Sequence, residues 1–266
     1  MRLFDTHCHF ETTDATAIAP LLKRAAEAGV EKLMAVGGSD ALNASAVAAR
    51  NTAKAMQAEG CKAPEVLIAL GYDREQIGKD HTSPSPLAFA SCAALGEIGL
   101  DYHYSPETRE AQMALFATQL EEARRDDLPV VIHTREAAND TIGLLREIPS
   151  HGIIHCFTGE PDEARAYLDL GFYVSFSGIV TFKAADNVRA SARIVPDDRL
   201  LLETDAPFLA PVPMRGKVNE PAFVRHTCEF LANFRGVSPN FLSELTFANA
   251  ESVLKKILSE KAEVKS

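Results

Sequence analysis

Eight short apolar runs alternate with longer stretches of helical or connecting character, and this alternation is the feature that most restricts the fold of the chain. The runs are rich in Val, Ile, Leu and Phe and span residues 3–10, 32–37, 66–72, 93–100, 129–134, 152–157, 172–178 and 200–205. Short runs of this kind are typical of parallel strands that are covered on both faces. A chain of 266 residues suits one α/β barrel, because such domains commonly contain about 200–250 residues. We therefore predict an α/β fold, a (β/α)8 TIM barrel, as one domain over residues 1–266.

The stretches between the runs carry helix signals of unequal strength. Residues 106–125 and 221–235 place apolar side chains at helical spacing, and a last helix is expected over 238–258. The polar tail, 259–266, should fray. The weakest unit is 73–92, which is short and contains two prolines, so we expect a short or irregular helix there.

Charge and cysteine content narrow the functional classes. The chain has 27 Lys and Arg against 37 Asp and Glu, a formal net charge of −10. This balance argues against a protein that coats nucleic acid, because such binding depends on basic side chains that neutralise phosphates. It leaves open an enzyme whose positive charge comes from metal ions. Five cysteines without a Cys-x-x-Cys pair argue against a disulfide framework or a zinc ribbon. No apolar run reaches the roughly 18 residues of a membrane span, and we expect a cytoplasmic protein.

Polar side chains stand at the ends of five of the apolar runs. His7 and His9 are two residues apart in the first run, so both imidazoles share one face of a strand. Single histidines or carboxylates end or interrupt four further runs, where a TIM barrel places its catalytic groups. A carboxylate in such a run is costly to bury unless it is paired or bound to metal. The predicted metal ligands are His7, His9, Glu97, His133, His155 and Asp205.

Six ligands suit two metal ions better than one. A mononuclear catalytic zinc site commonly uses three protein ligands and leaves a position for water. Two ions about 3.5–4 Å apart can lower the pKa of a water molecule, hold a phosphoryl oxygen and stabilise a leaving oxygen. Glu97 offers one carboxylate oxygen to each ion and could bridge them. The mixture of imidazole and carboxylate fits Zn, Mg, Mn or Co.

These residues lie in segments that resemble the TatD family of metal-dependent hydrolases, a branch of the amidohydrolase-like TIM barrels. The matching segments are 4–10, 96–102, 129–135, 155–159, 171–178, 202–211 and 215–221. The resemblance implies a TIM barrel with divalent-metal phosphodiesterase activity, typically a DNase with 3′-to-5′ exonuclease character. It also implies one ion held by His7, His9, Glu97 and Asp205, and a second held by Glu97, His133 and His155. Asp205 would in addition orient or deprotonate the attacking water, so Asp205 and Glu97 are the predicted catalytic residues.

The segment after the third run departs from the family pattern. Members usually carry Gly-x-His-Pro-His there, whereas this chain has Gly71-Tyr72-Asp73-Arg74. The missing residues belong to the substrate side of the family's site. The predicted metal ligands are therefore unaffected, while the identity of the substrate is left open. One alternative keeps the metal site and hydrolyses another ester, such as a D-aminoacyl-tRNA or a small phosphodiester. A metal-binding protein without catalysis is a further alternative. An amidase or lactonase with a carbamylated Lys on strand four is disfavoured, since Glu97 stands there.

Several residues outside the ligand set are candidates for other roles at the site. The predicted substrate contacts are Arg135, Lys217, Asn219 and His103. Arg135 follows His133 by two residues and should reach a phosphate from the same strand end. Glu203 lies two residues before Asp205 and is predicted to accept the outer N–H of a ligating histidine. The expected partner is DNA, at single-stranded ends, with no membrane and no obligate protein partner.

Overall fold

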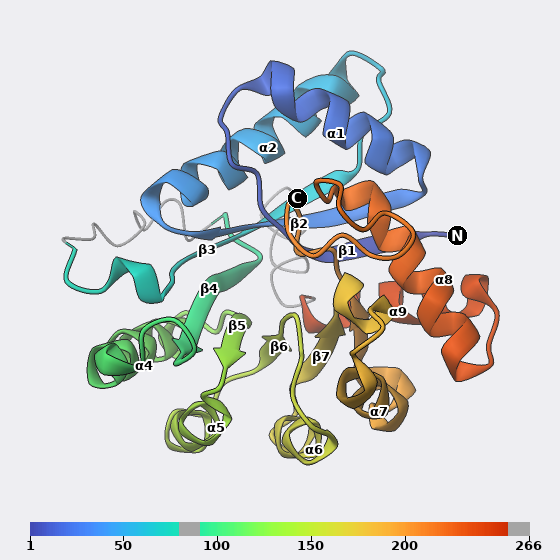
Figure 1. Cartoon of the computed structure of the whole chain (residues 1–266). Coiled ribbons are helices and arrows are strands. Elements are labelled where there is room, and N and C mark those ends of the chain that lie inside the picture. Colours follow the sequence, from blue (N-terminus) through green and yellow to red (C-terminus); the bar gives the residue numbers. More distant parts are fainter. Residues whose placement is uncertain (80–90, 255–266) are drawn as a thin grey trace.

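The eight predicted strands form one parallel sheet in sequence order, and the sheet curls into a barrel (Figure 1). The computed structural model describes residues 1–79 and 91–254. The strands are β1 Leu3–Cys8, β2 Val30–Gly38, β3 Glu65–Tyr72, β4 Ala94–Asp101, β5 Val130–Arg135, β6 Gly152–Ile154, β7 Tyr173–Phe176 and β8 Leu200–Leu202. Backbone bonds from Asp205 N to His7 O (2.9 Å) and from His9 N to Ala206 O (2.7 Å) join the last unit to the first. The predicted TIM-barrel fold is confirmed.

Helices cover the outside of the barrel (Figure 1). They are α1 Ala15–Glu27, α2 Asp40–Ala58, α4 Arg109–Arg125, α5 Ala138–Glu147, α6 Pro161–Asp169, α7 Asp186–Ile194, α8 Val224–Arg235 and α9 Pro239–Val253. None of these described helices combines the length and the apolar character needed to cross a membrane.

The predicted helices agree with the structure apart from their ends. The first turns of 106–125 and 221–235 are 3-10 helices, and α8 ends where Gly236 takes a left-handed φ of 72°. After β3 the chain forms a short 3-10 helix, Arg74–Gln76. An irregular helix is expected over 73–92, but most of the remaining residues, 80–90, lie outside the described residues. The expected helix end at 258 and the tail 259–266 also lie outside them.

The two ends of the barrel interior differ in chemistry. Phe4, Met34, Val131 and Leu201 pack together in one buried apolar cluster, and this cluster also includes Phe247 of α9. The rings of Phe4 and Phe247 lie 5.8 Å apart, centroid to centroid. Apolar side chains and α9 therefore fill the amino-terminal end of the barrel. Polar groups are left to the C-terminal rim, where the carboxyl ends of the strands meet.

The sheet opens between β3 and β4 toward this rim, and α4 fills the gap with side chains. The β3–β4 ladder pairs Ala69 with Ala94 and Leu70 with Leu95, and so stops before Tyr72 at the end of β3 and well before Asp101 at the end of β4. Beyond it, the Gln119 amide bonds both backbone groups of Tyr72, at 2.8 Å each. Gln112 does the same for Asp101, at 2.8 and 2.9 Å. Because buried backbone groups must be paired, these glutamines stand in for a neighbouring strand.

The Gln112 contact can be tested by a substitution that keeps its volume. Gln112→Leu should leave a buried N–H and a buried C=O of Asp101 without their partner, and lower the free energy of unfolding by about 2–4 kcal/mol. Thr118→Ala, on the exposed side of the same helix, is the control and should change it by less than about 0.5 kcal/mol. Urea denaturation followed by circular dichroism measures both. Equal stability of Gln112→Leu and wild type would contradict this role.

Candidate metal centre

All six predicted ligands meet at the C-terminal rim. His7 lies on β1, Glu97 on β4 and His133 on β5, while the others directly follow β1, β6 and β8. Most of these side chains are thus placed near a strand end, whereas Glu97 lies in the interior of β4, and the strands come from all parts of the sequence. Among the described residues, two groups have ligand atoms within 4.8 Å of one another. These groups are His7 with Glu97 and His155, and His7 with His9 and Asp205.

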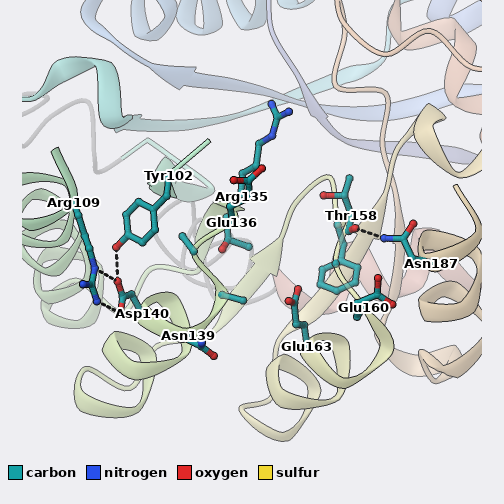
Figure 2. A pocket seen from close by; sticks show the side chains of 15 residues that line it. Tyr102, Arg109, Arg135, Glu136, Asn139, Asp140, Thr158, Glu160, Glu163 and Asn187 are labelled. Atoms are coloured by element: carbon teal, nitrogen blue, oxygen red, sulfur yellow. Dashed lines mark hydrogen bonds and ion pairs between the residues drawn. The ribbon is translucent and has the colours of Figure 1, made fainter. Parts of the chain in front are cut away.

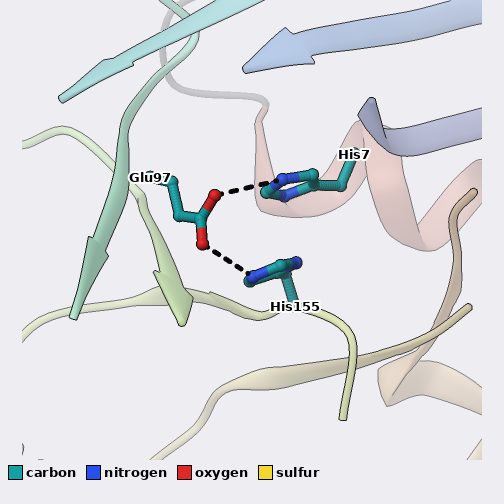
Figure 3. Close-up of side chains that lie close together, drawn as sticks. All are labelled: His7, Glu97 and His155. Atoms are coloured by element: carbon teal, nitrogen blue, oxygen red, sulfur yellow. Dashed lines mark hydrogen bonds and ion pairs between the residues drawn. The ribbon is translucent and has the colours of Figure 1, made fainter. Parts of the chain in front are cut away.

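Glu97 lies at the middle of the cluster and faces a different pair of imidazoles with each carboxylate oxygen. Its Oε2 is 3.4 Å from Nε2 of His9 and 3.6 Å from Nε2 of His7. Its Oε1 is 3.1 Å from Nδ1 of His133 and 3.2 Å from Nε2 of His155. Figure 3 shows the carboxylate between His7 and His155. This arrangement fits a carboxylate that bridges two cations, each with its own pair of histidines.

Asp205 follows β8, the last strand, which closes the barrel beside β1. Its carboxylate lies near the first pair of histidines, His7 and His9. Its Oδ1 is 3.9 Å from Nε2 of His7 and 3.8 Å from Nε2 of His9. The residue has a φ of 56°, in the left-handed region that few residues other than glycine adopt. The bond from its N–H to the carbonyl of His7 holds this turn in place. The strained turn thus places the carboxylate beside the β1 histidines.

Three of the histidines are fixed from outside by oxygen acceptors. Nδ1 of His9 lies 2.9 Å from the carbonyl of Val36. Nε2 of His133 lies 3.0 Å from Oδ2 of Asp101, and Nδ1 of His155 lies 3.4 Å from Oε1 of Glu203. An outer N–H that is held in this way leaves the lone pair of the other ring nitrogen directed at the centre. The cluster therefore has the donor set and the outer support of a metal site.

Asp101 is a functional candidate that the sequence reasoning did not single out. It is fully buried at the end of β4, where its carboxylate binds His133. Burial opposes its ionisation, but His133 and Arg74 outweigh burial and lower the pKa of Asp101 to about 2. A second carboxylate directly after the apolar run that contains Glu97 was the available signal. Glu203, in contrast, lies where the sequence predicted, against the outer nitrogen of a ligand histidine.

The acidic and basic groups of the centre strongly shift one another's pKa values. Burial raises the pKa of Asp205 to about 7, although His155 and His9 oppose the rise. Burial also works against ionisation of Glu97, yet His155, His133 and His7 hold its pKa well below the usual range. The pKa of His7 falls to about 4 because of burial and the nearby charge of His155. Buried carboxylates of this kind are stabilised by positive charge, which protons on the histidines or metal ions can supply.

The four predicted substrate contacts have different positions. Arg135 lines the cavity of about 760 Å³ that contains the metal centre. Lys217 and His103 are not among the described residues that line this cavity, and Nδ1 of His103 instead pairs with Glu136 at 2.7 Å. Asn219 is 3% exposed, and its amide donates to the carbonyls of Thr204 (2.8 Å) and Phe208 (2.5 Å). Asn219 therefore holds the loop after β8 in shape and has no N–H left for a phosphate.

A second hollow of about 750 Å³ adjoins the metal cavity and shares Arg135 with it (Figure 2). Carboxylates dominate its polar lining: Glu136, Asp140, Glu160 and Glu163. Arg109 contributes a cation, but Asp140 binds it at 2.6 and 2.8 Å. A phosphate would be repelled here, so this hollow is not an extension of a phosphate-binding path.

The family to which the chain belongs follows from comparison with known proteins. The sequence pattern of the family described as TatD related DNase matches residues 4–255. The chain therefore belongs to the TatD family of metal-dependent hydrolases, which confirms the predicted relationship.

Individual relatives support this assignment. Over 159 residues, 59% of this chain and 60% of the relative, the chain is 50% identical to the uncharacterized metal-dependent hydrolase YcfH of Escherichia coli K12. Over 169 residues, 60% of this chain and 64% of the relative, it is 37% identical to the 3′-5′ ssDNA/RNA exonuclease TatD of Rahnella sp. Y9602. The match thus spans less than two thirds of the length of these two relatives. The crystal structure of YJJV, a TatD homologue from Escherichia coli K12, superposes with a TM-score of 0.77 at 26% identity, over 95% of this chain and 97% of that chain.

Glu97→Gln tests the central position of this carboxylate. The amide keeps the volume but loses the negative charge that would hold two cations, so if Glu97 bridges them, bound metal should fall from two ions per chain to one or none. Metal analysis by mass spectrometry after dialysis against Zn²⁺ or Mn²⁺ measures the loss. Glu163→Gln, a carboxylate of the adjoining hollow, is the matched control and should keep the wild-type metal content. A Glu97→Gln protein that retained two ions would refute the bridging role.

Metal binding should release protons. Burial opposes protonation of His9, His133 and His155, but their carboxylate neighbours, Glu97 above all, raise the pKa of each above the usual value. In the metal-free protein these imidazoles therefore keep their protons to higher pH than an ordinary histidine does, and metal must displace those protons. Metal affinity should rise as pH increases through 6.5 and beyond. Calorimetry in buffers of different ionisation enthalpy measures the protons released at pH 7, with His226→Gln on α8 as an unaffected control. A heat that does not depend on the buffer would contradict this prediction.

Proposed function

We propose that this chain is a phosphodiesterase that removes nucleotides from the 3′ end of single-stranded DNA, with two divalent ions in the centre described above. The position of Glu97 between two pairs of histidines is the observation that carries this proposal. The relative named as a 3′-5′ ssDNA/RNA exonuclease supports nucleic acid as the substrate. The imidazole and carboxylate donors suit Zn, Mg, Mn or Co.

Each group of the chain has a definite task in such a reaction. His7, His9 and Asp205 would hold one ion and His133 and His155 the other, with Glu97 between them. Bound ions supply positive charge that acidifies water and neutralises phosphoryl oxygens. The outer partners of the histidines keep the imidazoles in register, so little reorganisation is needed when the substrate arrives.

Asp205 is the proposed general base. Its carboxylate is buried at the rim with a pKa of about 7, and it lines the cavity that would take the substrate. It accepts a proton from water as the water oxygen attacks phosphorus. It then returns that proton to the 3′-oxygen as the phosphorus–oxygen bond breaks. A carboxylate positioned beside both the attacking water and the leaving oxygen can perform both transfers.

A second candidate function keeps the centre and changes the ester. Here Tyr72 at the end of β3 and Asp73 and Arg74 after it stand in place of the family's usual histidines, and Asp73 and Arg74 line the metal cavity. This difference on the substrate side favours a substrate outside the usual family range, such as a small phosphodiester or a D-aminoacyl-tRNA. A panel of single-stranded DNA, RNA, a small phosphodiester and D-aminoacyl-tRNA, assayed with Mg²⁺ or Mn²⁺, separates the two functions.

Asp205→Asn tests the general base. The amide still offers an oxygen to a cation but cannot take up a proton, so kcat on a single-stranded oligonucleotide should fall about 10²- to 10⁴-fold, with a much smaller change in KM. Steady-state kinetics on metal-replete protein measure this, and thermal unfolding verifies the fold.

Glu203→Gln is the matched comparison, because Glu203 is the other buried carboxylate of this segment and faces the outer nitrogen of His155. Its kcat should fall less than that of Asp205→Asn. An Asp205→Asn enzyme within about threefold of wild type, beside an inactive Glu203→Gln enzyme, would make Glu203 the base.

A further inference from the structure

Two arginines and a tyrosine stand together on one side of the metal cavity. Arg74 follows β3, Tyr104 follows β4 and Arg135 ends β5, and all three line the cavity. The guanidinium carbon of Arg135 is 4.9 Å from the centre of the Tyr104 ring, and that of Arg74 is 5.5 Å from it. Two positive charges thus share one aromatic ring, a contact that stabilises each of them modestly.

The two guanidinium groups are not fully neutralised by the protein. Arg135 has no carboxylate within 4.0 Å among the residues that the structure describes, although its side chain is partly buried. Arg74 has Nε 3.5 Å from Asp101 and a terminal nitrogen 3.8 Å from Glu75, an exposed side chain. A guanidinium carries five N–H donors, so both groups have donors to spare. Their common complement is an anion with several acceptor oxygens.

Asp101 connects this cluster to the metal centre. Its Oδ1 accepts the backbone N–H groups of His103 and Tyr104, at 3.0 and 3.2 Å. Its Oδ2 faces both Arg74 and Nε2 of His133, the ring whose Nδ1 faces Glu97. One carboxylate therefore positions the tyrosine, one arginine and one ligand. The arginines lie one side chain farther out than the groups that would hold the scissile phosphate.

We propose that Arg74, Tyr104 and Arg135 form a binding subsite for the phosphate next to the scissile one. The subsite rests on the proposed phosphodiesterase function and names its substrate class: oligonucleotides with at least two phosphates, in preference to single phosphodiesters. Tyr104 is 63% exposed, so its ring also offers surface for the base or sugar of the same nucleotide. Arg74 occupies the loop where the family pattern places histidines, so this part of the subsite is particular to this chain's own sequence, whereas Arg135 lies in a segment that matches the family pattern.

Kinetics on two substrates test the subsite. One is bis(p-nitrophenyl) phosphate, which has a single phosphodiester and reports on the metal centre alone. The other is a single-stranded oligodeoxynucleotide. Arg74→Ala and Arg135→Ala should each raise KM for the oligonucleotide roughly 10- to 100-fold. They should leave kcat/KM for the small substrate within about threefold of wild type, at unchanged metal content. Arg165→Ala, on α6, removes the same charge away from the cavity and should leave both substrates unaffected.

A neutral linkage identifies the phosphate that is bound. A methylphosphonate next to the scissile linkage should weaken the oligonucleotide for wild type about as much as Arg135→Ala does. The same linkage should raise the KM of the Arg135→Ala enzyme little further, because that enzyme has already lost the contact. Equal losses on both substrates, or additive effects of linkage and variant, would overturn the subsite.

A binding measurement separates the subsite from the reaction. Fluorescence anisotropy with a labelled trinucleotide on Asp205→Asn protein should show that adding Arg74→Ala or Arg135→Ala raises Kd by a similar factor. Wild type that cleaves neither substrate would refute the proposed function, while this titration would still decide the subsite. An unchanged Kd in both arginine variants would refute the subsite.

Discussion

The buried carboxylate of Glu97 is the interaction on which the rim of the barrel depends. A lone buried carboxylate is unfavourable by several kcal/mol, so the chain must surround it with groups that carry or attract positive charge. Four imidazoles do so, two on each oxygen. The histidines come from three separate regions of the sequence, and only a closed barrel brings them to one point. Closure of the fold and assembly of the centre are therefore the same event.

The architecture around the centre separates apolar packing from chemistry. Phe4 and Phe247 lie in the cluster that fills the far end of the barrel, so water and ions can approach the centre from the rim alone. At the rim, Gln112 pairs the backbone of Asp101, and the Asp101 carboxylate binds His133. Helix α4, on the outer surface, thus holds the His133 ring at the centre through two successive contacts, from Gln112 to Asp101 and from Asp101 to His133. Placement by packed, hydrogen-bonded elements keeps the site preorganised.

The sequence predicted the barrel and the six side chains that meet at its rim, because both leave local signals. Strands covered on both faces appear as apolar runs, and a polar residue that ends such a run stands out. Contacts that depend on the path of a loop leave no such signal. Asn219 looks like an exposed loop residue in the sequence, yet the turn after β8 encloses it and uses both of its N–H groups. Gln112 likewise looks like the solvent face of a helix until the opening between β3 and β4 is known.

The arginine cluster shows the same limit, and under the proposed function it gives an acidic protein a place to bind a polyanion. Arg74, Tyr104 and Arg135 follow three different strands, and nothing in their spacing indicates that they meet. With a net charge of −10, the surface as a whole repels nucleic acid, and two divalent ions would still leave about −6. Attraction is then confined to the metal centre and two guanidinium groups beside it. A polyanion would bind favourably only where its phosphates reach the metal centre and the guanidinium groups at once. A free single-stranded end can do this, and the middle of a stiff duplex cannot. Under the proposed function, the acidic exterior would contribute to selectivity for ends, because it weakens every other mode of binding.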